Sequence, residues 1–158
     1  MHAGGPATAH FERKRPGWFA AHVFNPIVAA LTRLGLSLLG SRVLEVRGRS
    51  SGVPRRTPVN LLEFEGQRYL VAPRGETQWV RNLRASGEGR LLLGRRAEPF
   101  SATELADAEK MPLLRAYLKR WKAEVGAFFD GVGPDASDEE MARIAPKHPV
   151  FRLRRGAP

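Results

Sequence analysis

The turn at residues 48–58 reads GRSSGVPRRTP and decides the predicted fold. Runs of apolar residues flank it, at 43–47 before the turn and at 57–64 after it, so it joins two predicted strands. Gly48 and Gly52 permit positive φ angles and close approach of the backbone. The stretch therefore predicts two neighbouring strands joined by a turn rich in small residues and arginines.

Further strands and helices follow along the chain. Gly66 and Gly94 each separate two strand-like runs, which predicts two more hairpins. The six predicted strands are residues 43–47, 57–64, 68–72, 90–93, 99–103 and 150–153. Helices are expected at 76–84, from Pro112 to about residue 124, and after Ser137, where Ser137 and Glu140 form a capping-box pattern.

Short antiparallel strands with helices between the hairpins and at the ends predict an α+β domain around a small β-barrel. The strands and helices do not alternate as βαβ units, which argues against a doubly wound fold. The 158 residues fit one domain, which we place at residues 17–158. Residues 1–16 are small, polar or basic and predict a disordered arm.

Residues 26–39 predict a helix that needs a partner surface. Its apolar residues recur at helical spacing, and they are Ile27, Leu31, Leu34 and Leu38. The helix is too short to span a bilayer. We expect it to pack on the barrel, with a homodimer contact as the second alternative. The third is a peripheral contact with the inner face of the membrane, favoured by the basic residues 13–15.

Charge and composition limit the partners. A net charge of +10 raises the local concentration of anions, whether nucleic acid, an acidic membrane surface or a polyanionic small molecule. The arginines lie beside glycine turns rather than along a helix, so nucleic acid is not expected. The chain has no cysteine, which excludes disulfides and thiolate catalysis and fits a cytoplasmic protein. The four histidines lack metal-ligand spacing, so no metal is expected.

The residue types in the 48–58 turn suit an anionic group. Ser50 and Ser51 offer hydroxyls, and backbone N–H groups in such a turn form an anion nest. Arg49, Arg55 and Arg56 supply guanidinium groups that match phosphate or carboxylate geometry. The alternative is a solvated turn with scattered basic residues, and the residue chemistry alone leaves both interpretations open.

Three stretches in order resemble one known family. Residues 48–58 fit the pattern Gly-Arg-x-Ser-Gly-x-x-Arg-x-Thr-Pro, residues 79–83 fit Trp-x-x-Asn-Leu, and residues 149–153 read PVFRL. Together they resemble the deazaflavin-dependent nitroreductase family of actinobacteria, over roughly residues 43–93 and the last strand. The resemblance implies a split β-barrel of the flavin-reductase and pyridoxamine-phosphate-oxidase kind, with N-terminal and C-terminal helices.

The resemblance also implies a reaction and a site. It implies an oxidoreductase that uses reduced coenzyme F-420, rather than FMN, as hydride donor to a nitro compound, quinone or activated alkene. The alternative is a binding or storage protein for such a cofactor. The cofactor-binding residues it implies are Arg49, Ser50, Ser51, Gly52, Arg55, Arg56, Thr57, Pro58, Pro73, Arg74, Gly75, Trp79 and Asn82. A substrate pocket is expected at Tyr117, Trp121, Phe128 and Phe129, and no catalytic residue is assigned.

Overall fold

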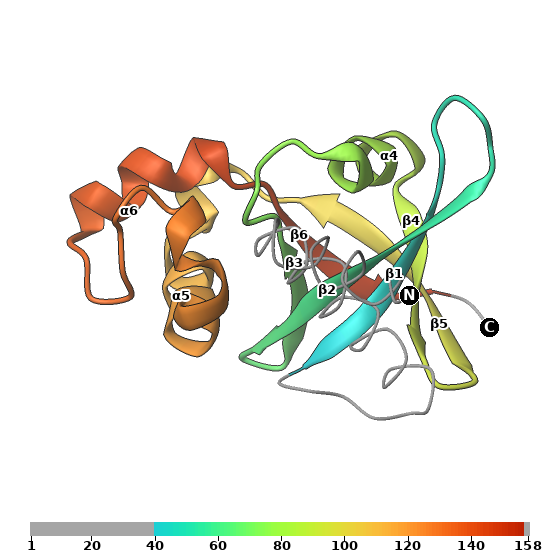
Figure 1. The fold of residues 1–158 in the computed structure, drawn as a ribbon, viewed down its shortest axis with the longest axis horizontal. Coiled ribbons are helices and arrows are strands. Elements are labelled where there is room, and N and C mark those ends of the chain that lie inside the picture. Colours follow the sequence, from blue (N-terminus) through green and yellow to red (C-terminus); the bar gives the residue numbers. More distant parts are fainter. Residues whose placement is uncertain (1–39, 157–158) are drawn as a thin grey trace, which may run out of the picture.

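The computed structural model describes residues 40–156 and contains one closed antiparallel barrel in the order β1-β2-β3-β6-β5-β4 (Figure 1). The strands are β1 (Ser41–Arg47), β2 (Pro54–Phe64), β3 (Gln67–Val71), β4 (Glu88–Leu93), β5 (Arg96–Glu104) and β6 (Val150–Arg155). The predicted arm at 1–16 and the predicted helix at 26–39 lie outside the described residues.

The helices lie where the sequence predicted them. They are α4 (Gln78–Ser86), α5 (Met111–Val125) and α6 (Asp138–Ile144), and Ser137 and Glu140 form the predicted capping box of α6. The barrel confirms the predicted fold class. Five strands begin earlier than predicted, and the difference is largest, at three residues, for β2 at Pro54 and β5 at Arg96. The first residues of these two strands show no apolar alternation, so the sequence did not indicate a strand there. They are strand residues because Pro54 pairs with Arg47 of β1 and Arg96 pairs with Leu93 of β4.

Alternate residues of the strands fill the barrel interior, as the two-residue period of a strand requires. Leu44 and Val46 of β1 pack there against residues of the other strands. The largest of these are Leu61, Leu70, Leu91, Phe100, Phe151 and Leu153. Helix α4 lies over one end of the barrel (Figure 1), where its buried Val80 and Leu83 join the same cluster. This packing fixes the position of α4 relative to β1.

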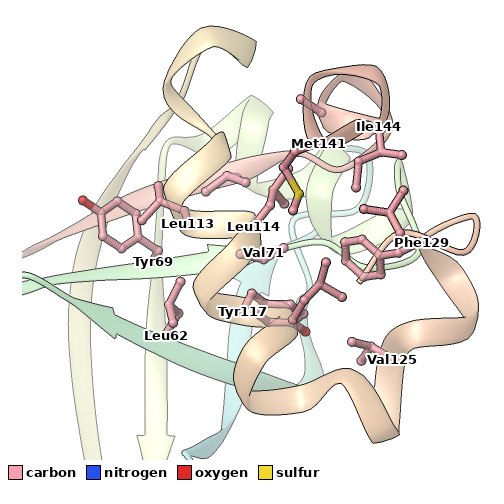
Figure 2. Packing of buried hydrophobic residues seen from close by; sticks show 14 of the residues in the cluster. Leu62, Tyr69, Val71, Leu113, Leu114, Tyr117, Val125, Phe129, Met141 and Ile144 are labelled. Atoms are coloured by element: carbon pink, nitrogen blue, oxygen red, sulfur yellow. The ribbon is translucent and has the colours of Figure 1, made fainter. Parts of the chain in front are cut away.

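A second apolar cluster joins α5 and α6 to the outside of the barrel. Leu62, Tyr69 and Val71 point outward from β2 and β3 and meet Leu114 and Tyr117 of α5 (Figure 2). Met141 and Ile144 of α6, both fully buried, complete the cluster beside Phe129. The two helices therefore form a side layer, and the opposite face of the barrel carries none of the described helices.

Gly89 of β4 lies against the backbone of β1 and the ring of Phe100. A Cβ atom at this position would lie 2.9 Å from the carbonyl oxygen of Glu45 and 2.9 Å from Cζ of Phe100. Gly89→Ala is expected to lower the free energy of unfolding by about 1–3 kcal/mol, because the clash involves backbone and a packed ring. Urea denaturation measures the change.

Gly133→Ala is the matched control, because its added Cβ would meet nothing closer than 3.7 Å. Equal stability of the two variants would contradict this account of barrel closure.

His148 is buried beside the helical layer and is 2% exposed. Its ring stacks on Phe129, with centroids 4.0 Å apart and planes at 15°. Nδ1 lies 3.3 Å from the carbonyl oxygen of Ala72, and Nε2 is buried without a hydrogen-bond partner among the described residues. Burial is the main cause that lowers the pKa of His148 below 6.5, with Lys110 adding to it and the Ala72 carbonyl and Asp130 opposing it.

This lowered pKa makes stability depend on pH. Below pH 6.5 the unfolded chain binds a proton at His148 before the folded chain does, so the free energy of unfolding falls as pH decreases. The slope approaches about 1.4 kcal/mol per pH unit until the folded pKa is reached. Urea denaturation between pH 7.5 and about pH 5 should show a flatter dependence for His148→Phe. Parallel curves for the two proteins would refute the assignment.

Candidate functional site

A cavity of about 560 Å³ lies between the β1–β2 hairpin and the N-terminal end of α4. The hairpin extends beyond the barrel and passes beside α4 (Figure 1). Strand residues, turn residues and the first turn of α4 all contribute to its wall. The lining residues are Val46, Gly48, Arg49, Ser50, Ser51, Arg55, Arg56, Thr57, Thr77, Gln78, Trp79 and Asn82.

The tip of the hairpin is held by its own hydrogen bonds. The Gly48 N–H donates to the Val53 carbonyl at 2.9 Å, and the Gly52 N–H donates to the Gly48 carbonyl at 2.9 Å. Gly52 has φ +74°, a conformation that favours glycine. The Ser51 hydroxyl accepts from the Val53 N–H at 3.1 Å. The turn is therefore a defined structure rather than a loose connection.

Arg49 ties this hairpin to α4. Both its backbone N–H and its Nη1 donate to Oδ1 of Asn82, at 3.1 and 2.8 Å, and Nη1 also donates to Oε1 of Gln78 at 3.0 Å. Asn82 is only 5% exposed, so its amide is fixed by the packing of α4. The pairing sets the width of the cavity and holds a guanidinium at its wall.

Arg55 and Arg56 of β2 extend the basic wall and differ in their surroundings. The Arg55 side chain has no ion pair or hydrogen bond within the described part of the chain. Nε of Arg56 donates to Oε2 of the buried Glu45 at 2.8 Å, and Nε of Arg90 donates to Oε1 at 2.9 Å. Burial alone would raise the pKa of Glu45, but hydrogen bonds from Arg90 and Arg56 outweigh it and lower the pKa. The carboxylate is therefore charged and orients Arg56.

The start of α4 adds polar groups to the same wall. Thr77 is the N-cap residue, but its side chain makes no capping bond, and its Oγ1 is buried without a partner among residues 40–156. The first N–H groups of a helix lack intrahelical partners and favour negative charge. Trp79, half-buried, adds an apolar surface and lies 6.1 Å from Phe151 between ring centroids. An anion with a planar apolar group fits this combination.

The structure gathers most of the predicted cofactor-binding residues around this cavity. They are Arg49, Ser50, Ser51, Arg55, Arg56, Thr57, Trp79 and Asn82. Gly52 shapes the turn, Pro58 lines a second cavity, and residues 73–75 lie in the β3–α4 loop outside the lining. Four more residues line the cavity although the sequence did not predict them as site residues: Val46, Gly48, Thr77 and Gln78. Thr77 could have been predicted as the N-cap residue of α4, because threonine is common at this position and stands just before the Trp-x-x-Asn-Leu motif.

The aromatic residues predicted for a substrate pocket lie elsewhere. Tyr117 and Trp121 are each 2% exposed, and Phe129 is fully buried in the cluster between the barrel and the helices (Figure 2). Phe128 is 43% exposed, and the Arg74 guanidinium lies 5.1 Å from its ring centroid. This packing corrects the prediction, because three of the four side chains are core residues and have no surface left for a substrate.

Two further kinds of feature are absent from residues 40–156. No group of three or more His, Asp or Glu residues there is arranged to hold a metal ion. No helix within that range is long and apolar enough to cross a membrane.

Solved structures share this fold. One described as an F-420-H2 Dependent Reductase (FDR-A) is 19% identical, with a TM-score of 0.53 over 73% of this chain and 94% of the other. A domain-swapped dimer is 18% identical, with a TM-score of 0.53 over 88% and 99%. A protein of unknown function from Agrobacterium tumefaciens is 18% identical, with a TM-score of 0.54 over 90% and 57%. At these identities the likeness shows the fold alone.

Comparison with curated proteins found no match, whereas comparison with protein families found one. The model of that family, F-420H(2)-dependent quinone reductase, matches residues 13–127. The match extends beyond residues 43–93, where the sequence resemblance lies, on both sides. It ends before β6 and its PVFRL motif. Because it covers more than half of the 158 residues, the chain belongs to the F-420H(2)-dependent quinone reductase family, an oxidoreductase family whose cofactor is coenzyme F-420.

Proposed function

We propose that this chain transfers a hydride from reduced coenzyme F-420 to a small electrophilic acceptor, with quinones as the first class and nitro compounds and activated alkenes as the others. The observation that carries the proposal is the link from Arg49 to Asn82, which holds a basic hairpin against the start of α4. A cavity built in this way is shaped before any ligand binds, which lowers the ordering cost of binding.

The donor groups of the cavity fit the anionic tail of this cofactor. Arg55 is free to form charge-assisted hydrogen bonds with a phosphodiester or carboxylate, and Arg49 adds a second positive charge nearby. The buried Thr77 hydroxyl, unpartnered among the described residues, is a third donor. Trp79 provides a surface for the ring system. We propose these four residues, with Ser50, Ser51, Arg56, Thr57 and Asn82, as the cofactor-binding set.

Reduced F-420 supplies the hydride when it is bound, so the protein has to bind, orient and exclude water rather than provide an acid–base pair. Reduction of a quinone balances as F-420H2 plus quinone giving oxidised F-420 plus hydroquinone: the quinone takes up the hydride and a proton, and the cofactor gives up a hydride and a proton. The alternative function is cofactor storage without turnover. The two functions differ in one measurable respect, which is oxidation of the bound cofactor when an acceptor is added.

Turnover tests the proposal directly. The purified chain should bind F-420 more tightly than FMN in calorimetric titrations, because the basic wall matches a tail with several negative charges. With reduced F-420, adding 2-methyl-1,4-naphthoquinone should restore the absorbance of the oxidised cofactor. Tight binding without oxidation by quinones, nitro compounds or activated alkenes would favour storage. Tighter binding of FMN would overturn the cofactor-binding site proposed here.

Arg55→Ala tests the proposed tail contact. Loss of a charge-assisted hydrogen bond should weaken F-420 binding by about tenfold to a hundredfold. Because Arg55 has no partner within the described residues, thermal unfolding should stay unchanged. Arg154→Ala, an exposed residue of β6 outside the cavity, controls for the loss of one positive charge. An unchanged dissociation constant in folded Arg55→Ala would remove Arg55 from the site.

A further inference from the structure

A second cavity, of about 380 Å³, lies on the outer face of the barrel. It is bordered by β1, β2, β4 and the turn between β4 and β5. Its floor is apolar and includes Val43, Pro58 and Leu92, and Ala97 lies at its edge. Val43 points to this outer face, whereas the neighbouring Leu44 and Val46 of β1 point into the barrel interior. The second cavity is thus separate from the apolar clusters that stabilise the fold.

Four arginines surround this apolar floor: Arg56, Arg90, Arg95 and Arg96. Glu45 lies directly between the first two, since it is the cross-strand partner of Arg56 on β2 and of Arg90 on β4. One carboxylate therefore offsets part of two positive charges. The side chains of Arg95 and Arg96 form no hydrogen bond or close ion pair with any described residue, although the positive charge of Arg96 also helps to lower the pKa of Glu98. The cavity keeps an excess of positive charge at the β4–β5 turn.

The second cavity adjoins the first. Arg56 and Thr57 of β2 line both, so the two cavities share one wall. Glu45 holds the Arg56 guanidinium at this border through the 2.8 Å bond to Nε. The shared wall places the second cavity directly beside the first, rather than at a remote part of the surface.

We propose that the second cavity binds an aromatic organic anion, with its ring on the apolar floor and its carboxylate or sulfonate at Arg95 and Arg96. Resting on the proposed function, we identify this anion as a class of electron acceptor: quinones that carry an acidic substituent. The glutamate chain of the cofactor offers the same negative charge. The apolar floor favours a ring over that hydrophilic chain, and the experiment distinguishes the two.

Binding is tested without turnover. The probe is 1,4-naphthoquinone-2-sulfonate, titrated by calorimetry into the full chain, into the double variant Arg95→Ala/Arg96→Ala and into the control Arg154→Ala. The double variant should lose about tenfold or more in affinity, because it lacks both unpaired guanidinium groups, and the control should match the parent chain. Absence of binding to the parent chain, or equal affinity in all three proteins, would overturn the proposal.

Two further measurements assign the ligand. In the double variant the KM for the sulfonated quinone should rise about tenfold. The KM for neutral 2-methyl-1,4-naphthoquinone and the dissociation constant of F-420 should both stay the same. A weaker F-420 affinity in the double variant would show that the cofactor tail binds in this cavity, and it would contradict the acceptor assignment. If neither quinone is reduced by any of the three proteins, the proposed function fails, whereas the anion site is still judged by calorimetry.

Discussion

Closure of the barrel between β1 and β4 is the constraint on which both cavities depend. β1 pairs with β2 along its whole length and with β4 through Val43, Leu44 and Glu45. The pairing needs close backbone approach, and Gly89 provides it, since any Cβ there would meet the carbonyl oxygen of Glu45 at 2.9 Å. A closed barrel leaves no free strand edge. It also presents β2 and β4 on either side of β1, so that Glu45 stands between Arg56 and Arg90.

Glu45 shows how the sheet register controls charge. A buried carboxylate is costly unless it is paired and hydrogen-bonded, and here two arginines on opposite neighbours satisfy both oxygens. The charges do not cancel, because two guanidinium groups share one carboxylate. The surface around it remains basic, which suits anions on both sides of the strand. The same contact that relieves the burial of Glu45 therefore also orients a residue of the proposed site.

Much of the fold could be predicted because local signals agreed with it. Glycines marked the hairpins at Gly66 and Gly94, and the capping box marked the start of α6. The starts of β2 and β5 were missed because pairing partners rather than apolar alternation define them. The motif at residues 48–58 led to the first cavity because turn, arginines and hydroxyls lie in one continuous segment.

Sites made by segments far apart in the sequence were harder to predict. The aromatic residues of α5 were placed in a pocket, but helical spacing shows only that Tyr117 and Trp121 share one face, not what that face meets. In the structure the face meets β2 and β3, so the rings are core. The second cavity depends on β4 lying beside β1, which no local pattern in either strand reveals.

Successive side chains of β2 point to opposite sides of the sheet, so Arg55 lines only the first cavity and Pro58 only the second, whereas Arg56 and Thr57 between them line both. Val59 and Leu61 pack in the barrel interior, which puts Arg55 and Thr57 on the same side, whereas Arg56 and Pro58 share the outer side with Glu45. A slip of one residue in the pairing of β1 with β2 would exchange these two sets. The turn from Gly48 to Val53, closed by its own backbone bonds, fixes that register. Its hydrogen bonds therefore determine not only the shape of the hairpin tip but also the side of β2 to which each arginine points.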